Sequence, residues 1–521
     1  MAENQTLKSR LTERKVDMKY MDSTNKLLTF VSKSKCLWAL LVHVNRLGWL
    51  ESFYVAGFDD SLFPIRREEN WKFQSCKSDT YAIVPGKTGD DETVFEFIED
   101  QQWQFFVPVF RPENIAYEFD YSCRMPFIRE FQTEETNFSA VTEVVIHRKH
   151  MEFPPNNQIG TAIDEAGNFH VAVKEVTSAR RLDRSDFEKL VENEASVLLH
   201  FGKQDHPHFI QTIARYTQGN RHFFIFPWAK GGNLRNLWRG QSSLSTASLN
   251  FSQEYCVQYI DWFFEQLLGL SGAIDKLHNP PGQPGGSCRH GDLKPENILC
   301  FCSVIPKVGD LLTGVKLVIA DAGHARIHEK ATDLRGERTT TQAGTQAYTP
   351  PEVEAQSDKA RPRRYDIWSI GCLYLEFLIW ILYGIGGLEA FLDDVKRAQP
   401  YTFYRTNPDV SLKPEVQAWI EAIKKDPRCA PIKLTAVGRL IGLIETRLLV
   451  VNIGVQPKKT TQSSSFDDED PTLTGVEPMK LSVRSPTMDS SELPATERAD
   501  ASEMLREMDN IVKAARSQAI V

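Results

Sequence analysis

The sequence lacks the cysteine spacings of a disulfide framework or a zinc site. Nine cysteines are spread over 521 residues, and no Cys-x-x-Cys pair occurs among them. Only Cys300 and Cys302 are close, on one face of a predicted strand, and a metal site there would need two further ligands. The odd number of cysteines favours a reducing compartment, so we expect a cytoplasmic or nuclear protein.

The sequence also lacks an apolar leader and an excess of positive charge. Residues 1–20 are polar and charged throughout, so we expect no signal peptide. The most apolar run, 367–388, contains Glu376 and several glycines, which favours a buried helix over a membrane span. The formal net charge of -8 argues against nonspecific binding to nucleic acid, so we expect no nucleic-acid partner.

The pattern of residues changes several times along the chain, which is too long for one hydrophobic core of about 250–300 residues. Residues 1–125 combine apolar positions at helical spacing with many aromatics, and predict a mainly helical N-terminal extension. Two interpretations remain open for it: a module that packs only for its own stability, and a partner-binding surface. Residues 126–451 show strand patterns first, clearest in the β-rich runs 140–147 and 170–176, and helical patterns afterwards, which predicts an α+β domain.

The C-terminal part of the chain has a different composition. Residues 452–495 are rich in Ser, Thr, Pro and Asp, which predicts a disordered tail. In residues 496–521 the apolar side chains Met504, Met508 and Ile511 share one stripe, which predicts a last amphipathic helix.

The segment from His290 to Asn297, HGDLKPEN, carries the strongest chemical signal. It places Asp292, Lys294 and Asn297 in one loop. Phosphoryl transfer needs a carboxylate that accepts the proton of the attacking hydroxyl, a cation that offsets phosphoryl charge, and an oxygen ligand for Mg²⁺. No structural requirement explains this octapeptide, so the three residues are candidate catalytic residues.

Two further segments support the same chemistry. Asp321 follows the apolar run 315–320, so its carboxylate lies at a strand end, where it can reach a metal ion. Lys174 ends the segment Val-Ala-Val-Lys on a predicted strand and can reach phosphates. A buried lysine needs a carboxylate partner, and Glu194 in the predicted helix 186–200 is the candidate.

The order of these motifs resembles that of eukaryotic protein kinases over roughly residues 126–450. The family implies a two-lobed fold, with a small β-rich lobe, a large helical lobe and ATP between them. It implies that Lys174 and Glu194 form an ion pair, that Asp292 is the catalytic base, and that Asn297 and Asp321 hold Mg²⁺. The chain is also similar to a divergent fungal group of kinase-like proteins with aromatic N-terminal extensions.

The resemblance assigns further residues to ATP and to the activation segment. The residues expected at ATP are Phe138, Val141, Ala172, Lys174, Glu194, Phe226, Trp228 and Ala229. Those expected in the activation segment are Gly323, Thr339, Thr340, Thr341, Thr345 and Glu352. The Lys294 motif together with Gly344 and Thr345 implies serine/threonine specificity.

The sequence departs from the family in four places. One is the Pro- and Gly-rich insert 280–286 just before His290, which predicts a surface loop. The loop 136–141, expected to cover the phosphates, contains no glycine. Gly291 replaces the usual arginine, which implies independence from activation-segment phosphorylation. Ala322 replaces the usual phenylalanine of the Asp-Phe-Gly motif. The partner of Glu352 is not evident, and Lys433 is the candidate.

Two functions therefore remain open. The first is an active serine/threonine kinase, an ATP-dependent phosphotransferase that uses Mg²⁺ and acts on a protein substrate. The second is a pseudokinase-like scaffold that binds partners, with or without ATP, with little turnover. A small-molecule phosphotransferase is disfavoured, because the segment from Gly344 to Glu352 resembles one that seats a peptide.

Overall fold

The computed structural model describes most of the chain outside the two ends and several loops. The chain forms two compact units, the first of Met1–Gly202 with Ile210–Ala229 and the second of Lys203–Phe209 with Lys230–Val521. The described residues are 24–86, 89–135, 139–153, 162–177, parts of 185–198, 206–241, 253–280, 288–302, 312–321, 346–355, 363–429, 431, 434–452 and 497–518.

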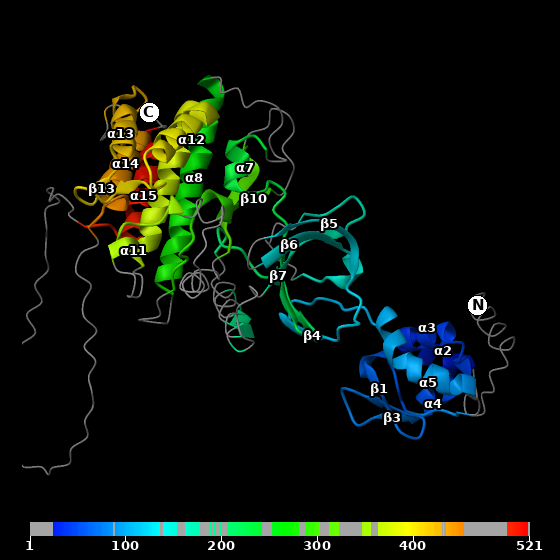
Figure 1. Cartoon of the computed structure of the whole chain (residues 1–521). Coiled ribbons are helices and arrows are strands. Elements are labelled where there is room, and N and C mark those ends of the chain that lie inside the picture. The colour runs from blue at the N-terminus through cyan, green and yellow to red at the C-terminus, as the bar shows by residue number, and fades with distance from the viewer. Residues whose placement is uncertain are drawn as a thin grey trace, which may run out of the picture. The chain divides into compact units, whose positions relative to one another are not determined.

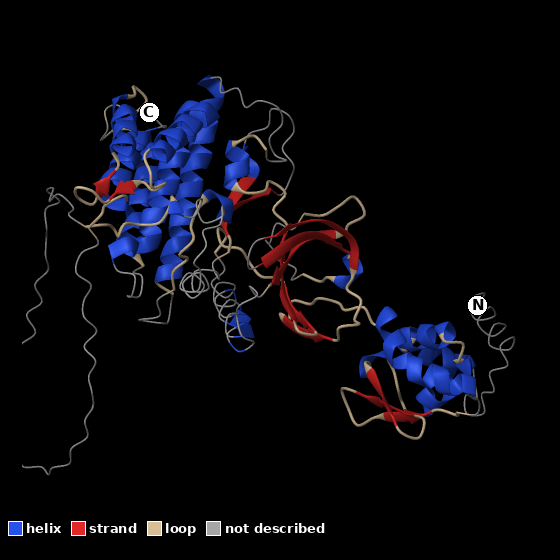
Figure 2. Ribbon diagram, in the orientation of Figure 1, coloured by secondary structure: helices blue, strands red, loops and turns tan. Residues whose placement is uncertain are grey.

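The N-terminal extension contains both helices and a small sheet (Figures 1 and 2). Its helices are α2 (Thr24–Lys33), α3 (Lys35–His43), α4 (Leu50–Val55) and α5 (Gly89–Gln101). Its strands are β1 (Ile65–Glu68), β2 (Lys72–Ser75) and β3 (Tyr81–Ile83), which pair antiparallel in that order. The extension is thus mainly helical, as predicted, and short polar turns add a three-stranded meander over 65–83 that the sequence pattern did not predict.

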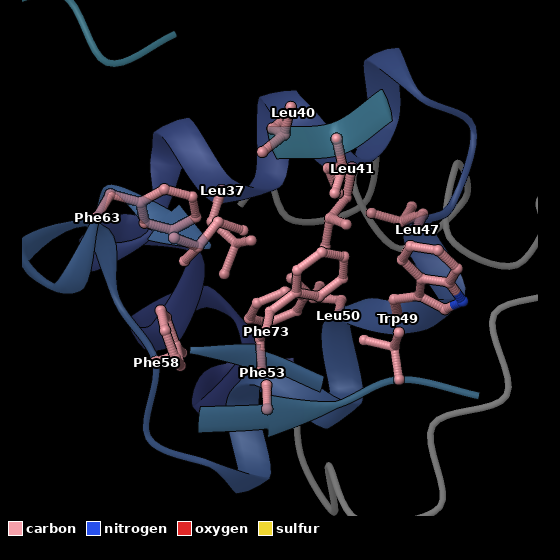
Figure 3. Close-up of a cluster of buried hydrophobic side chains, with 14 residues drawn as sticks. Leu37, Leu40, Leu41, Leu47, Trp49, Leu50, Phe53, Phe58, Phe63 and Phe73 are labelled. Carbon is pink, nitrogen blue, oxygen red and sulfur yellow. The ribbon is translucent and has the colours of Figure 1, made fainter. Parts of the chain in front are cut away.

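An apolar cluster packs the helices of the extension against its sheet (Figure 3). Phe53 stacks on Phe73, with ring centroids 6.0 Å apart, and meets Phe58 edge-on at 5.4 Å. Leu37, Leu40 and Leu41 of α3 are fully buried in the same cluster, together with Leu50. The helical spacing seen in the sequence thus builds a separate hydrophobic core.

The β-rich part of the first unit is one six-stranded sheet in the order β4-β8-β9-β7-β6-β5. Its strands are β4 (Ala116–Phe119), β5 (Phe127–Glu135), β6 (Ser139–Ile146), β7 (Phe169–Val176), β8 (Ala214–Gln218) and β9 (Arg221–Pro227). All neighbours pair antiparallel except β4, which runs parallel to β8. β6 and β7 occupy the segments where β-branched runs predict strands.

Strand β4 covers the β8 edge of this sheet, although it precedes the predicted boundary at residue 126. Tyr117 and Phe119 of β4 pack with Phe110, which is 1% exposed, in the core of the sheet. Tyr216 of β8 joins the same aromatic group. The sheet therefore includes residues that the sequence pattern assigned to the extension.

The second unit is mainly helical. Its helices are α7 (Leu234–Trp238), α8 (Gln253–His278), α11 (Glu352–Ala355), α12 (Arg364–Arg397), α13 (Pro414–Lys425), α14 (Ala436–Leu443), with a π-helical continuation over Ile444–Leu448, and α15 (Ala501–Gln518). Two antiparallel strand pairs join them: β10 (Ile298–Cys302) with β11 (Val315–Ile319), and β12 (Tyr404–Arg405) with β13 (Ser411–Leu412).

Helix α12 is the centre of the helical unit. It has the length and hydropathy of a membrane span, and no other described helix does, but 67% of its apolar window is buried inside the protein. Residues 365–382 are all buried, and the helix is kinked at Gly384, whose φ is 68°. A helix buried to this extent is a core helix of the protein, as the sequence predicted for 367–388.

Helix α15 belongs to this unit although it follows the long segment 453–496. It contacts α8 and α14, and Met504 and Met508 are fully buried. Figure 1 shows it in red among the helices of the second unit. Residues beyond 495 therefore complete the helical core.

Candidate active site

The loop 290–297, which we call the catalytic loop, is anchored to α12 by a buried aspartate. Asp366 is fully buried and accepts hydrogen bonds from the backbone N–H groups of His290 and Gly291, each at 2.8 Å. Its Oδ2 also lies 2.8 Å from His278 Nε2. Burial acts to raise the pKa of Asp366, but His278 and the backbone donors hold it below its ordinary value. The ionised carboxylate thus fixes the start of the loop.

Gly291 adopts a backbone conformation that suits glycine. Its φ is +76°, in the left-handed region that side chains with a Cβ avoid. Its N–H is bound by Asp366, so the loop keeps this shape without an arginine side chain at position 291.

Two of the candidate catalytic side chains, Lys294 and Asn297, each lie within hydrogen-bond distance of the third, Asp292. Lys294 Nζ is 2.8 Å and Asn297 Nδ2 is 3.0 Å from Asp292 Oδ2. Asn297 Nδ2 also donates to the backbone oxygen of Asp292 at 2.7 Å. Asp292 is 6% exposed, and its buried Oδ1 has no hydrogen-bond partner among the described residues. This oxygen can therefore accept a further hydrogen bond.

Asn297 and Asp321 lie at one end of the β10–β11 pair. Ile298 pairs with Ile319, and the N–H of Ala320 donates to the backbone oxygen of Asn297 at 2.9 Å. Asp321 follows at once, with a φ of +66° that is uncommon for a residue with a side chain. Such a conformation persists only where the surroundings impose it, and it is enriched at functional sites.

The donor set at this strand end fits Mg²⁺. Because Asn297 Nδ2 is engaged by Asp292, its amide oxygen faces away from that contact. An amide oxygen and a carboxylate are ligands that Mg²⁺ takes, usually with phosphate oxygens completing the shell. No cluster of three His, Cys, Asp or Glu occurs among the described residues, and two protein ligands suffice for such a site.

The predicted ATP-binding residues of the first unit lie on adjacent strands of its sheet. Lys174 on β7 is 6% exposed and pairs in register with Val141 of β6. Ala172 pairs with Phe226 of β9. Ala229 is buried and Trp228 is half-buried after the end of β9. Phe138 and Glu194 lie outside the described residues.

In the activation segment, Glu352 is the described member of the predicted set. Gly323, Thr339, Thr340, Thr341 and Thr345 lie outside the described residues, as does Lys433. Glu352 is held by Arg498, with Nη1–Oε1 at 2.6 Å and Nη2–Oε2 at 3.0 Å. The described partner of Glu352 is thus a bidentate arginine that stands 146 residues after it, while the suggested pairing with Lys433 stays a prediction.

Arg498 was missed by the sequence analysis. It is fully buried, donates to the backbone oxygens of Val450 and Arg364, and lies over the ring of Trp368 at 5.0 Å. The available signal was weak: an arginine just before an amphipathic helical pattern, in a chain where Glu352 needs a cation.

Comparison with known proteins agrees with this arrangement. A family model described as protein kinase domain matches residues 157–383. The serine/threonine-protein kinase ksg1 of Schizosaccharomyces pombe is 28% identical over 218 residues, which cover 42% of this chain and 32% of that protein. The Aurora/IPL1-related protein kinase 2 of Caenorhabditis elegans is 25% identical over 215 residues, covering 41% and 56%.

This chain contains a eukaryotic-type protein kinase domain. The six-stranded sheet of the first unit and the helical second unit supply the two lobes of that fold, and ATP is the nucleotide that the domain implies. The matches span about a third to just over half of the length of these relatives. The matched range ends within α12, whereas α13, α14 and α15 complete the helical lobe beyond it.

Proposed function

We propose that this protein is an active serine/threonine protein kinase that transfers the γ-phosphoryl group of Mg-ATP to a protein hydroxyl. The observation that carries the proposal is the buried, unpartnered Oδ1 of Asp292 beside Lys294 and Asn297. An unsatisfied buried carboxylate oxygen is unfavourable in a folded protein, which supports a functional reason for it.

The catalytic loop can perform the proton chemistry of this reaction. Asp292 Oδ1 would accept the hydrogen bond, and then the proton, of the substrate hydroxyl as its oxygen attacks. Lys294 is held by Asp292 Oδ2, on the other carboxylate oxygen, so its charge stays beside the transferring group. The two oxygens of one carboxylate thus orient the cation and the nucleophile.

Asn297 and Asp321 would hold Mg²⁺, and Lys174 would bind the ATP phosphates from the small lobe. When bound, the metal would neutralise phosphate charge. Asp321 has a left-handed backbone conformation two residues after the end of β11. The N–H of the preceding residue, Ala320, donates a hydrogen bond to the backbone oxygen of Asn297. The names of the relatives and the Lys294 motif support serine/threonine specificity.

A scaffold with little turnover is the second candidate, and the glycine-free loop 136–141 favours it. Glycines let the backbone approach phosphates closely, so their absence predicts weaker ATP binding. Mg-ATP at about 100 times its Kd should stabilise the protein by roughly 2.7 kcal/mol if it binds the folded state alone. No shift of the melting temperature at millimolar Mg-ATP would contradict an active kinase.

The test of the proposed function is an Asp292→Asn variant of the full chain, incubated with γ-labelled ATP, Mg²⁺ and a basic substrate protein. We expect label on serine or threonine from the wild type, and a rate about 10²–10⁴-fold lower from the variant, because the proton acceptor is lost. The matched control is Asp393→Asn, at an exposed position of α12, which should keep the wild-type rate. Equal labelling by wild type and Asp292→Asn would overturn the assignment of Asp292.

A further inference from the structure

A second group of charges is buried next to the catalytic loop, and the proposed chemistry does not use it. Arg235 of α7 is 7% exposed, and its Nε donates to Glu296 Oε1 at 3.1 Å. Its Nη2 lies 3.0 Å from Oε2 of Glu376 on α12, and also donates to the hydroxyl of Tyr348. We call Arg235, Glu296, Tyr348 and Glu376 the Arg235 network.

Further hydrogen bonds connect Tyr348 and Glu376 within the network. The Tyr348 hydroxyl donates to the Glu376 carboxylate, whose oxygens lie 2.9 and 3.1 Å away. Glu376 is fully buried, and burial raises its pKa, while Arg235 and Tyr348 oppose the rise. Glu296 has a half-exposed side chain, with 44% of its surface accessible. One arginine thus joins a buried carboxylate to a carboxylate at the surface of the catalytic loop.

Stability alone does not explain a buried arginine here. Its Nη1 is buried and has no hydrogen-bond partner among the described residues, which costs free energy. Buried ion pairs are often no more stabilising than well-packed apolar residues of similar volume. A Met at 235 with an apolar partner at 376 would fill the same space without these costs. The arrangement therefore points to a role in positioning.

The partners of Arg235 lie on the two segments that a kinase must align. Glu296 stands between the catalytic residues Lys294 and Asn297 in the loop. Tyr348 stands four residues before Glu352, in the segment expected to seat the peptide, and its backbone oxygen accepts from Ser369 of α12 at 2.8 Å. Because both segments meet one guanidinium, a shift in either is opposed by the other.

We propose that Arg235 is a positioning residue that holds the catalytic loop and the end of the activation segment in register with each other. The proposal rests on the kinase function proposed above. Since Arg235 contacts neither Asn297 nor Asp321 in the described contacts, its loss should affect the transfer step and the peptide substrate, and leave the affinity for Mg-ATP largely unchanged.

The test uses the full chain with Arg235→Met, which removes the charge, and Arg235→Lys, which keeps it. We expect kcat to fall between about 10- and 100-fold in Arg235→Met, because small misplacements of catalytic groups have effects of this size. The KM for ATP should stay within about twofold of wild type, and Arg235→Lys should lose less activity than Arg235→Met.

A matched control separates positioning from loss of any buried cation. Lys413 is 3% exposed, and its Nζ donates to backbone oxygens at the C-terminal end of α12, with no described hydrogen bond to the catalytic loop or to the Arg235 network. Lys413→Met should lower thermal stability but keep the wild-type kcat per folded molecule. A fall in kcat as large as that of Arg235→Met would contradict a specific role of Arg235.

Amide hydrogen exchange tests the proposal without relying on activity. In Arg235→Met, exchange should become at least about tenfold faster in both 290–300 and 346–353, because their shared contact is lost. In Lys413→Met, both segments should keep wild-type rates. Unchanged exchange in these segments of Arg235→Met would overturn the proposal. A wild type that transfers no phosphoryl group would instead refute the proposed function, and the exchange result would still decide the role of Arg235.

Discussion

The N-terminal extension and the helical unit bury different kinds of side chain. In the described part of residues 24–106, the buried polar residues are Ser34, Ser75 and Gln102, all of them neutral. The helical unit buries charged residues as well as apolar ones: Arg235, Asp292, Asp366, Glu376, Lys413 and Arg498. Both regions bury many apolar side chains, so burial of apolar surface is not what distinguishes them.

The difference shows which region can be held together by the packing of apolar side chains alone. The extension can fold by burying the rings of Phe53, Phe58 and Phe73, and it contains no buried charge among its described residues. In the helical unit, each buried charge is bound to a loop that carries chemistry or to the end of a helix. Charges are costly to bury unless they are paired, so their number in the helical unit, compared with none in the described extension, marks a region where the positions of side chains are fixed by specific pairing.

The largest effect is expected from breaking the pair of Arg498 and Glu352. Arg498→Met leaves the Glu352 carboxylate, whose side chain is 9% exposed, beside an apolar residue, which should lower the free energy of unfolding of the helical unit by about 3–5 kcal/mol. Denaturant unfolding of the full chain would measure it. The double variant Arg498→Met/Glu352→Gln should recover part of the loss. A loss below about 1 kcal/mol in Arg498→Met would show that this buried ion pair contributes no more than an exposed one, contrary to the difference between the two regions.

A second effect concerns acid sensitivity, which two neighbouring histidines should confer on the helical unit. Burial lowers the pKa of both His206 and His208 to about 4, from an ordinary 6.5. Between these values the unfolded chain binds more protons than the folded one, so stability rises with pH from about 4 to 6.5 and falls on acidification. His208 should contribute a loss of about 2 kcal/mol between pH 7 and pH 5.

His208→Gln should reduce this pH dependence. Gln does not titrate, and the variant should therefore show a smaller decrease in the free energy of unfolding between pH 7 and pH 5, measured by urea unfolding. The ring packs against Gly269 and its Nδ1 bonds the backbone oxygen of Leu317 at 2.7 Å, so the variant will be less stable at both pH values. An unchanged pH dependence would show that His208 has the same pKa in the folded and unfolded protein.

The smallest effect is expected in the extension. Gln102 is 1% exposed, accepts from the N–H of Ile65 and donates to its carbonyl oxygen, each at 2.8 Å. Gln102→Leu would leave the N–H and the carbonyl oxygen of Ile65 without their side-chain partner but would add apolar contacts. We expect the free energy of unfolding to fall by about 1 kcal/mol. Thermal unfolding would measure it. A loss as large as that of Arg498→Met would remove the contrast between the two regions.

Local patterns anticipated the parts of this fold that depend on neighbours in sequence. The β-branched runs at 140–147 and 170–176 are strands β6 and β7, and the apolar run at 367–388 is part of the buried helix α12. The loop residues Asp292, Lys294 and Asn297 lie together because they are at most five positions apart. Their catalytic roles, and those of Lys174 and Asp321, stay predictions.

Contacts between distant segments were not anticipated. The pairing of β4 with β8 joins residues about a hundred positions apart, and no turn signal connects them. The strands of the extension are only three or four residues long, too short for a clear alternation of apolar and polar positions. Arg235 has no motif of its own, since its partners come from three separate segments.

By itself the sequence determined the kinase motifs, their order and the α+β arrangement, because these follow from side-chain chemistry and short-range periodicity. The tertiary structure alone decided which cation holds Glu352, which strand covers β8, and which arginine joins Glu296 to Tyr348 and Glu376. The physical reason is that a buried charge must find an opposite charge or a hydrogen-bond partner in space, and only the folded chain determines which distant residue lies within reach.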